Sequence, residues 1–246
     1  MFINTLLSND SPLPWQLGFQ DSGSPIHEGI VDLHDAIMYY LVLMAVLVTW
    51  MLGSVIATFG PNRLTNTHAT HGTIIELIWT ITPAFILFAI ALPSFRLLYL
   101  MDEISLPGLT IKVVGSQWYW SYEYSDYITE SGEVVEYDSY LIPESDLELG
   151  ELRLLSVDEP VVIPVNTAVR AIVTARDVIH DFAVPSLGLK LDAIPGRLNQ
   201  ASVIAQRIGS FYGQCSELCG VMHGFMSIQV DVVSQDNFLR WLGTRG

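Results

Sequence analysis

The sequence predicts a helical hairpin that spans a membrane, followed by an all-β domain outside it. Half of the 246 residues are hydrophobic and only 15% are charged, whereas about a quarter are charged in a typical globular chain. Two long charge-free runs lie near the N-terminus, and the remainder alternates apolar with polar residues. The net charge is nevertheless −15, so apolar and charged residues are segregated along the chain. This acidic balance gives no reason to expect a nucleic-acid partner.

The first charge-free run extends from Ala36 to Asn62, after five acidic residues and before the first cation, Arg63. Its apolar part, residues 36–59, would form a helix roughly 36 Å long, enough to cross a hydrocarbon core of about 30 Å. The run is too long for a secretory signal and follows no basic residues. We therefore expect a membrane anchor, with neither a secretory signal nor a mitochondrial transit peptide.

The second charge-free run, LIWTITPAFILFAIALPSF, covers residues 77–95. Pro83 and Pro93 would disturb a soluble helix, but membrane helices tolerate proline when neighbouring groups satisfy the freed backbone. Two buried helices of a soluble protein are the alternative. The loop between the runs carries Arg63, His68 and His71 and no acid, so the positive-inside rule places it inside and both termini outside.

We expect three parts: an N-terminal extramembrane segment over 1–35, a hairpin over 36–100 and a β domain over 101–246. The spans are predicted at about 36–59 and 76–98. The last part carries 20 acidic and nine basic side chains. Segments of period two are TIKVVG, YLIP, VVIP, AVRAIVT, QASVIAQ and SIQVDVV, and NFLRWLG fits a short helix. Short strands at this spacing predict a β-sandwich or barrel.

The only two cysteines, Cys215 and Cys219, lie in CSELCGVMHGFM together with His223 and Met226. A disulfide would suit an oxidising compartment but leaves the histidine and the methionine unexplained. Packing along one helical face is a second interpretation, but two glycines interrupt the stretch. Structural zinc is a third, although zinc has no need of a thioether.

A copper centre uses all of these side chains, because thiolate, imidazole and a weak methionine ligand form the sites of electron-transfer copper proteins. Two thiolates can bridge two copper ions, and each ion then needs a terminal histidine. Four of the six histidines lie before or between the predicted spans, and His223 is already in the stretch. His180 is therefore the remaining histidine of the β domain.

Several segments together resemble subunit II of the cytochrome c oxidases. They are CSELCGVMHGFM, DVIHDFAVPSLGLKLDAIPGRLNQ, HGTIIELIWTITPAFILFAIALPSFRLLYLMDE and GSQWYWSYEYSD. The resemblance covers most of the chain and is closest to the mitochondrial type. It implies a cupredoxin-like β domain with a dinuclear copper centre, CuA, in a subunit that takes electrons from cytochrome c. These electrons would pass to haem in subunit I, where oxygen reduction is coupled to proton pumping.

The resemblance assigns the ligands as bridging cysteines, terminal histidines, a weak thioether and one backbone carbonyl. The expected copper ligands are His180, Cys215, Glu217 through its carbonyl, Cys219, His223 and Met226. It also implies a Mg²⁺ ion shared with subunit I and bound by the carboxylate of Glu217. Carboxylate oxygen is a ligand that this hard cation prefers.

Further residues acquire roles from the same resemblance. Trp118 would be the point where electrons enter, and Glu76 would lie at the mouth of a proton pathway. Simple core packing and helix capping are the respective alternatives. Acids expected to steer basic cytochrome c are Glu123, Asp126, Asp138, Asp158 and Asp177, unless they only form a soluble surface.

The implied location is the mitochondrial inner membrane, with both termini and the copper domain in the intermembrane space. A bacterial plasma membrane is the alternative. Two other functions remain open: a quinol oxidase subunit II, which lacks the copper ligands, and a copper delivery or sensing protein, which needs no membrane hairpin.

Overall fold

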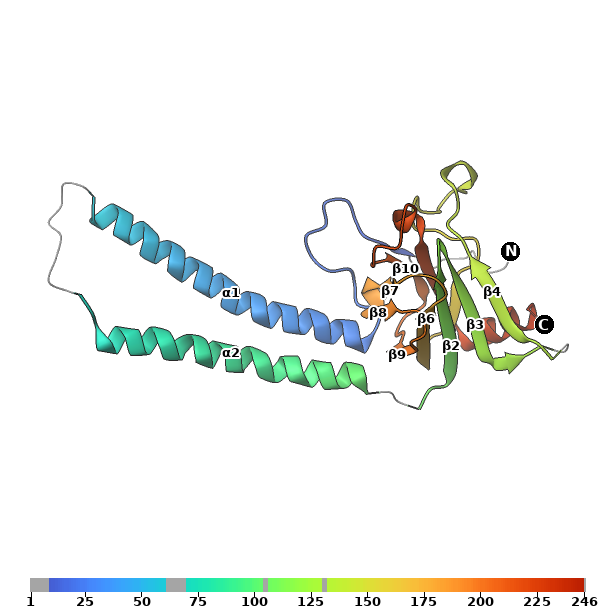
Figure 1. Ribbon diagram of the computed structural model, residues 1–246, viewed down its shortest axis with the longest axis horizontal. Helices are drawn as coiled ribbons and strands as arrows, with labels where there is room; N and C mark the ends of the chain where they lie inside the picture. The colour runs from blue at the N-terminus through green and yellow to red at the C-terminus, as the bar shows by residue number, and fades with distance from the viewer. Residues whose placement is uncertain (1–8, 61–69, 104–105, 130–131, 246) are drawn as a thin grey trace. The chain divides into compact units, whose positions relative to one another are not determined.

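The computed structural model describes residues 9–60, 70–103, 106–129 and 132–245 (Figure 1). Arg63 and His68 of the predicted loop lie outside these residues. The chain forms two compact units. One contains Gly29–Tyr99, and the other joins the N-terminal part through Glu28 to Leu100–Gly246.

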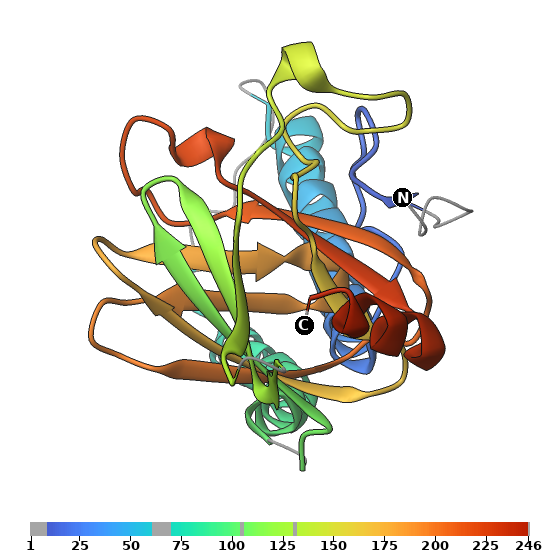
Figure 2. The ribbon, with the colours of Figure 1, turned by 90° about the vertical axis from the view of Figure 1, so that its right-hand side faces the viewer.

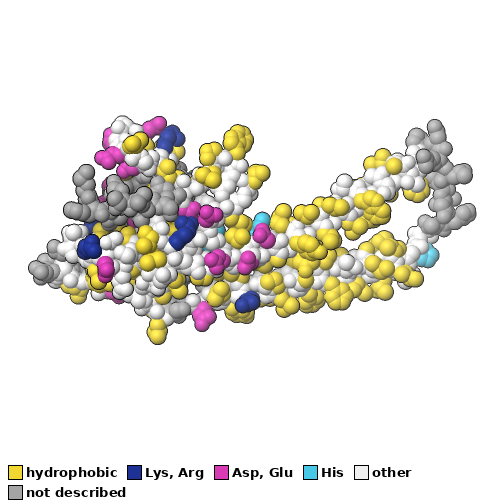
Figure 3. Space-filling model, turned by 180° about the vertical axis from the view of Figure 1, so that it is seen from behind, with side chains coloured by type: hydrophobic (Ala, Val, Ile, Leu, Met, Phe, Trp, Pro, Cys, Tyr) yellow, Lys and Arg dark blue, Asp and Glu magenta, His cyan; other side chains and the backbone are white. Residues whose placement is uncertain are grey.

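Two helices dominate the first unit: α1 covers Pro25–Thr58 and α2 covers Thr73–Asp102. Both are long and apolar enough to cross a membrane, and their visible side chains are mainly hydrophobic in Figure 3. Helix α1 begins well before the charge-free run because Pro25 suits a first helical position and the Ser24 hydroxyl accepts a hydrogen bond from the His27 N–H at 3.1 Å. The alternative of two buried soluble helices is wrong, since the most apolar part of each helix is exposed.

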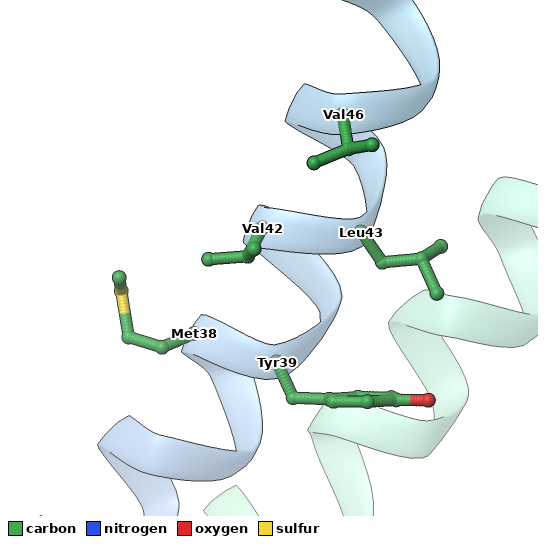
Figure 4. Close-up of a pocket in the computed structure, with 5 residues that line it drawn as sticks. All are labelled: Met38, Tyr39, Val42, Leu43 and Val46. Atoms are coloured by element: carbon green, nitrogen blue, oxygen red, sulfur yellow. The ribbon is translucent and has the colours of Figure 1, made fainter.

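A shallow apolar hollow lies along α1, lined by Met38, Tyr39, Val42, Leu43 and Val46. In Figure 4, Met38 and Val42 point to one side of the helix and Tyr39 and Leu43 to the other. Residues four apart lie on the same face of a helix, which explains this grouping. The lining is almost entirely apolar, as expected for a surface covered by lipid or by another helix.

The β domain is a sandwich of two sheets (Figure 2). The first has the order β5-β11-β10-β7-β8, with β1 paired to β10, and the second has the order β4-β3-β2-β6-β9. The strands of the first sheet are β1 (Asn9–Asp10), β5 (Val161–Pro164), β7 (His180–Val184), β8 (Leu189–Ala193), β10 (Gly209–Cys215) and β11 (Ser227–Val233). Those of the second are β2 (Leu109–Ser116), β3 (Tyr119–Ile128), β4 (Val134–Ser139), β6 (Ala168–Ala175) and β9 (Asn199–Ile204).

The core lies between the sheets and is built by alternation along the strands. In β2 and β6 alternate side chains are buried, as expected when one face of a strand meets the core. Short 3₁₀ turns cover Glu144–Asp146 (η1), Pro185–Leu187 (η2) and His223–Phe225 (η3). Helix α3 (Gln235–Gly243) starts at Ser234, whose hydroxyl accepts a bond from the Asn237 N–H, and buries Phe238 and Trp241.

Most of the predicted strands are present. TIKVVG, VVIP, AVRAIVT, QASVIAQ and SIQVDVV lie in β2, β5, β6, β9 and β11, and NFLRWLG lies in α3. The expected strand YLIP is wrong: only an isolated bridge joins Leu141 to Val157. Pro143 has no N–H to donate, and the Tyr140 N–H bonds the Asp158 side chain at 2.7 Å instead of a strand.

The N-terminal segment packs on the sandwich, which the sequence did not lead us to expect. Strand β1 runs parallel to β10, and Arg207 pairs with Asp10 and donates to the carbonyl of Asp21 at 3.0 Å. The N–H of Gly23 donates to Ser186 at 2.8 Å. A Cβ on Gly23 would lie 2.4 Å from the Phe211 ring, so only glycine allows this approach.

Candidate metal centre

The cysteine stretch forms the connection between β10 and β11. Cys215 ends β10, and its N–H donates to the carbonyl of Met226 at 3.0 Å, which closes the base of the loop. Between them, Gly220 has φ of +129°, a conformation that L side chains rarely adopt. The loop thereby turns Cys219 back toward Cys215.

His180 reaches the two cysteines from the neighbouring strand. It begins β7, whose pairing with β10 sets Phe182 opposite Cys215. His180 Nδ1 lies 4.0 Å from the Cys215 sulfur, and the two sulfurs are 4.0 Å apart. Ligand atoms of these three buried residues all lie within 4.8 Å of one another, an arrangement that could hold a metal ion. The remaining imidazole, His223, has Nδ1 3.6 Å from the Cys219 sulfur.

The geometry removes two of the alternatives. A disulfide would bring the sulfurs to about 2.05 Å, whereas both cysteines are free thiols. The stretch is not a helix either, since its one helical turn is the 3₁₀ segment His223–Phe225. The donor set of soft sulfur and imidazole fits copper. Met226 is buried at the base of the same loop, so its thioether faces no bulk water.

The two thiols have different proton affinities. Burial alone would raise the pKa of Cys215, but its hydrogen bonds with His180, with the backbone of Asp181 and Glu217, and with His223 lower that pKa to about 7. Burial and the negative charge of Cys215 raise the pKa of Cys219 to about 12. In the metal-free protein one thiolate therefore forms near neutral pH, and a bound cation is needed to remove the second proton there.

Two close contacts fix the His180 ring. Its Nε2 lies 2.8 Å from the Asp177 carboxylate. On the other side, a Cβ at Gly115 in the opposing sheet would lie only 2.9 Å from His180 Cδ2. Burial lowers the pKa of His180, but its contacts with Cys215 and Asp177 outweigh that effect and raise it. The ring is completely buried, with the Asp177 carboxylate at Nε2 and Gly115 close to Cδ2.

Trp118 lies beside the metal loop. It is partly buried and packs against the core, and its indole N–H has no hydrogen-bond partner among the described residues. A cleft of about 360 Å³ borders it, and Tyr140, Met222 and Phe225 contribute to the lining. The side chain of the preceding Gln117 donates to the carbonyl of Cys219 at 2.8 Å.

The five acids expected to meet a partner all accept hydrogen bonds within the chain. The donors are Lys112 for Glu123, Thr110 for Asp126, Ser121 for Asp138 and Tyr140 for Asp158, at 2.6, 2.6, 2.6 and 2.7 Å. Asp177 accepts three bonds, described below. Glu123 forms an ion pair with the ammonium group of Lys112.

Two further predicted residues, Glu217 and Glu76, contribute no carboxylate to the cluster of His180, Cys215 and Cys219. The Glu217 carbonyl is 3.3 Å from the Cys215 sulfur, while its carboxylate is exposed and belongs to no metal-holding group among the described residues. Glu76 lies in the first turn of α2, and its carboxylate accepts a bond from the Gly72 N–H at 3.1 Å. This contact caps the helix.

Sequence reasoning missed three residues that shape the site: Gln117, the inward role of Asp177, and Gly115. A carboxylate or an amide in a loop carries no signal of which side chain it will meet. Gly115 lies far from His180 in sequence, so only the packing of one sheet on the other brings them together.

Comparisons with known proteins agree with this geometry. Residues 109–233 match the family "Cytochrome C oxidase subunit II, periplasmic domain", and residues 12–97 match its transmembrane domain. The chain is 60% identical to cytochrome c oxidase subunit 2 of Mycosarcoma maydis over 98% of this chain and 96% of that one. Identity to the Wickerhamomyces canadensis protein of the same name is 57%, over 98% of both.

A solved structure supports the fold of the β domain. The periplasmic domain of subunit II of cytochrome oxidase from Bradyrhizobium japonicum matches with a TM-score of 0.52 and 47% identity, over 58% of this chain and 96% of that one. Two helices able to span a membrane, followed by a cupredoxin-like sandwich, confirm the predicted fold class.

Proposed function

Because the chain belongs to the cytochrome c oxidase subunit II family, we propose that it takes electrons from cytochrome c at a dinuclear copper centre and passes them to haem in subunit I. Oxygen reduction and proton pumping would then occur in the assembled oxidase. The observation that carries this proposal is the buried cluster of His180, Cys215 and Cys219, whose thiols are free and 4.0 Å apart.

The proposed ligands follow from the donor set around these sulfurs. Cys215 and Cys219 would bridge two copper ions, His180 and His223 would each complete one, and Met226 would be a weak ligand. The Glu217 carbonyl, already directed at the Cys215 sulfur, would add an oxygen. When bound, the copper pair supplies a one-electron store.

The protein's own contribution is to hold these donors still. His180 is held between Asp177 and Gly115, and the backbone bond from Cys215 to Met226 fixes the two ends of the loop. A site that moves little between its two oxidation states exchanges electrons with little reorganisation. Burial also keeps water away from the sulfurs.

Docking of cytochrome c is proposed on the face that carries Trp118. The partly buried indole and the cleft beside it offer an apolar contact, and the acidic excess of the β domain would attract a basic partner. The five acids named above belong to this excess, although each is also held by internal hydrogen bonds. Their effect on docking should therefore appear in the association rate and its salt dependence.

Two further roles belong to the same proposal. The exposed carboxylate of Glu217 is available for a Mg²⁺ ion completed by subunit I, since that cation takes carboxylate oxygen. Glu76, at the start of α2, would lie at the mouth of a proton pathway into subunit I. Its observed contact with Gly72 is compatible with that role, because one carboxylate oxygen remains available.

The proposed location is the mitochondrial inner membrane, with the copper domain in the intermembrane space. The relatives named above support a membrane oxidase subunit. Pairing of β1 with β10 supports an even number of spans, because the N-terminal segment and the β domain must then lie on the same side. The proposed domain division is a hairpin over 36–100 between the segment 1–35 and the copper domain 101–246.

Copper titration of the full chain in detergent micelles tests this function. We expect two copper ions per chain and an electron paramagnetic resonance signal from one unpaired electron shared between two copper nuclei. Met226→Leu should keep both ions and shift the reduction potential, whereas Cys215→Ser should lose the shared signal. One copper per chain, or a spectroscopically silent zinc site, would contradict the proposal and favour a metal-delivery or structural role.

A further inference from the structure

The carboxylate of Asp177 is 33% exposed, and both of its oxygens accept hydrogen bonds. It accepts hydrogen bonds from the backbone N–H groups of Gln117 and Val178, both at 2.7 Å, and contacts His180 Nε2 at 2.8 Å. Each carboxylate oxygen therefore already accepts a backbone N–H, and the oxygen that takes the Val178 N–H also faces the imidazole.

This contact decides which nitrogen of His180 is free. Both oxygens of the Asp177 carboxylate already accept backbone N–H groups, so the carboxylate is placed as an acceptor and Nε2 of His180 is the donor in this contact. Nδ1, which faces the Cys215 sulfur at 4.0 Å, then presents its lone pair toward the cluster. Metal-binding histidines almost always donate their second ring N–H to such a partner.

Gln117 joins the same carboxylate to the other half of the site. Its backbone N–H bonds Asp177, while its side chain donates to the carbonyl of Cys219 at 2.8 Å. Trp118 follows directly, and a Cβ on Gly220 would lie 3.2 Å from two atoms of its indole. Gln117, the residue directly before Trp118, is thus bonded to both segments that carry the metal donors.

We propose that Asp177 and Gln117 are positioning residues: Asp177 orients His180, and Gln117 holds Trp118 at a fixed distance from the Cys219 segment. This inference rests on the proposed function, because it concerns a metal bound by His180 and an electron that enters through Trp118. It differs from the docking role expected for Asp177, since the carboxylate acts here through its buried neighbour and not through its charge on the surface.

Variants of Asp177 test the first half of the proposal in the purified oxidase complex. Competition with a chelator should show copper held about 10- to 100-fold more weakly in Asp177→Ala. Asp177→Asn preserves shape and can still accept from the backbone, so it should show a smaller loss with an altered electron paramagnetic resonance signal. Glu136→Gln, which removes one exposed charge from β4, is the control and should leave copper unchanged.

Gln117→Ala tests the second half. Copper content and KM for cytochrome c should stay the same, while the single-turnover rate of electron transfer to copper falls about tenfold because Trp118 is held less well. Gln206→Ala, an exposed glutamine on another loop, is the matched control.

The outcomes separate the two proposals. If Asp177→Ala raises only the KM for cytochrome c and leaves copper affinity unchanged, as in the Glu136→Gln control, Asp177 is a docking acid and the inference is wrong. An unchanged transfer rate in Gln117→Ala likewise removes the role of Gln117. If the unaltered chain binds no copper pair, the proposed function itself fails, and that result is visible before any variant is made.

Discussion

Replacing Gly115 with alanine should disturb the metal centre from the opposite sheet. The new Cβ would lie 2.9, 3.0 and 3.1 Å from Cδ2, Cγ and Cβ of His180, whereas carbon atoms in contact are normally about 3.5–4.0 Å apart. The ring must therefore retreat by roughly half an ångström. Metal–ligand distances tolerate only about 0.2 Å, so the displacement exceeds what a bound ion allows.

The free energy follows from two opposing effects. Overpacking a filled core costs about 1–3 kcal/mol, and His180 has no free space to move into because it is completely buried. Alanine also restricts the unfolded chain, which returns about 0.4–1 kcal/mol. We expect a net loss of about 1–2 kcal/mol in the free energy of unfolding and copper affinity reduced at least about tenfold.

Chemical denaturation and chelator competition measure both quantities. Gly243→Ala is the control, because a Cβ there meets nothing within 4 Å and its backbone carries no positive φ. It should be neutral or slightly stabilising. The reasoning about Gly115 is refuted if Gly115→Ala and Gly243→Ala unfold at the same denaturant concentration and bind copper equally.

Three further changes have defined outcomes. Arg207→Met removes the contacts with Asp10 and should lower the free energy of unfolding by about 1–2 kcal/mol and expose the N-terminal segment to limited proteolysis, unlike the exposed control Arg240→Met. Tyr124→Phe leaves the buried Val162 N–H without its hydroxyl acceptor and should destabilise by about 1–3 kcal/mol in thermal unfolding. In the metal-free protein the pKa of Cys215 is depressed to about 7, below the value of about 8.5 for an unfolded cysteine. The Cys215 thiolate therefore adds fully to the free energy of unfolding above pH of about 8.5, and this contribution is lost as pH falls through about 7. A pH titration followed by the ultraviolet absorbance of the thiolate should show a step near pH 7. This step should be absent in Cys215→Ser.

The parts of the molecule that a local pattern defines were predictable from the sequence. Charge-free length is enough to identify a membrane helix, and β6 shows the alternation expected for a strand with one buried face. The histidine that completes the cluster could be named because the β domain has only two histidines, His180 and His223. That His180 at the start of β7 would meet Cys215 at the end of β10 was an expectation from chemistry, and the distance of 4.0 Å between Nδ1 and the sulfur supports it.

The parts that depend on long-range packing were not predictable. Strand β1 has only two residues, Asn9–Asp10, and no alternation of apolar and polar side chains. Its sequence therefore does not predict that it pairs with β10. YLIP has the composition of a strand, but the Tyr140 N–H donates to the side chain of Asp158 and is not available to pair with a neighbouring strand. From the sequence Asp177 resembles any exposed acid, and only the folded structure shows its contact with the buried imidazole of His180.

The clamp between Asp10 and Arg207 joins residues 197 positions apart and therefore sets an order of events during synthesis. The N-terminal segment leaves the ribosome first, yet Arg207 and β10 exist only after both helices and most strands have been made. Contacts of such high sequence separation form slowly, although the entropy of closing a longer loop grows only gradually. The sandwich must then fold before β1 and Asp10 can dock onto it, so a segment that is made early is among the last to reach its final position.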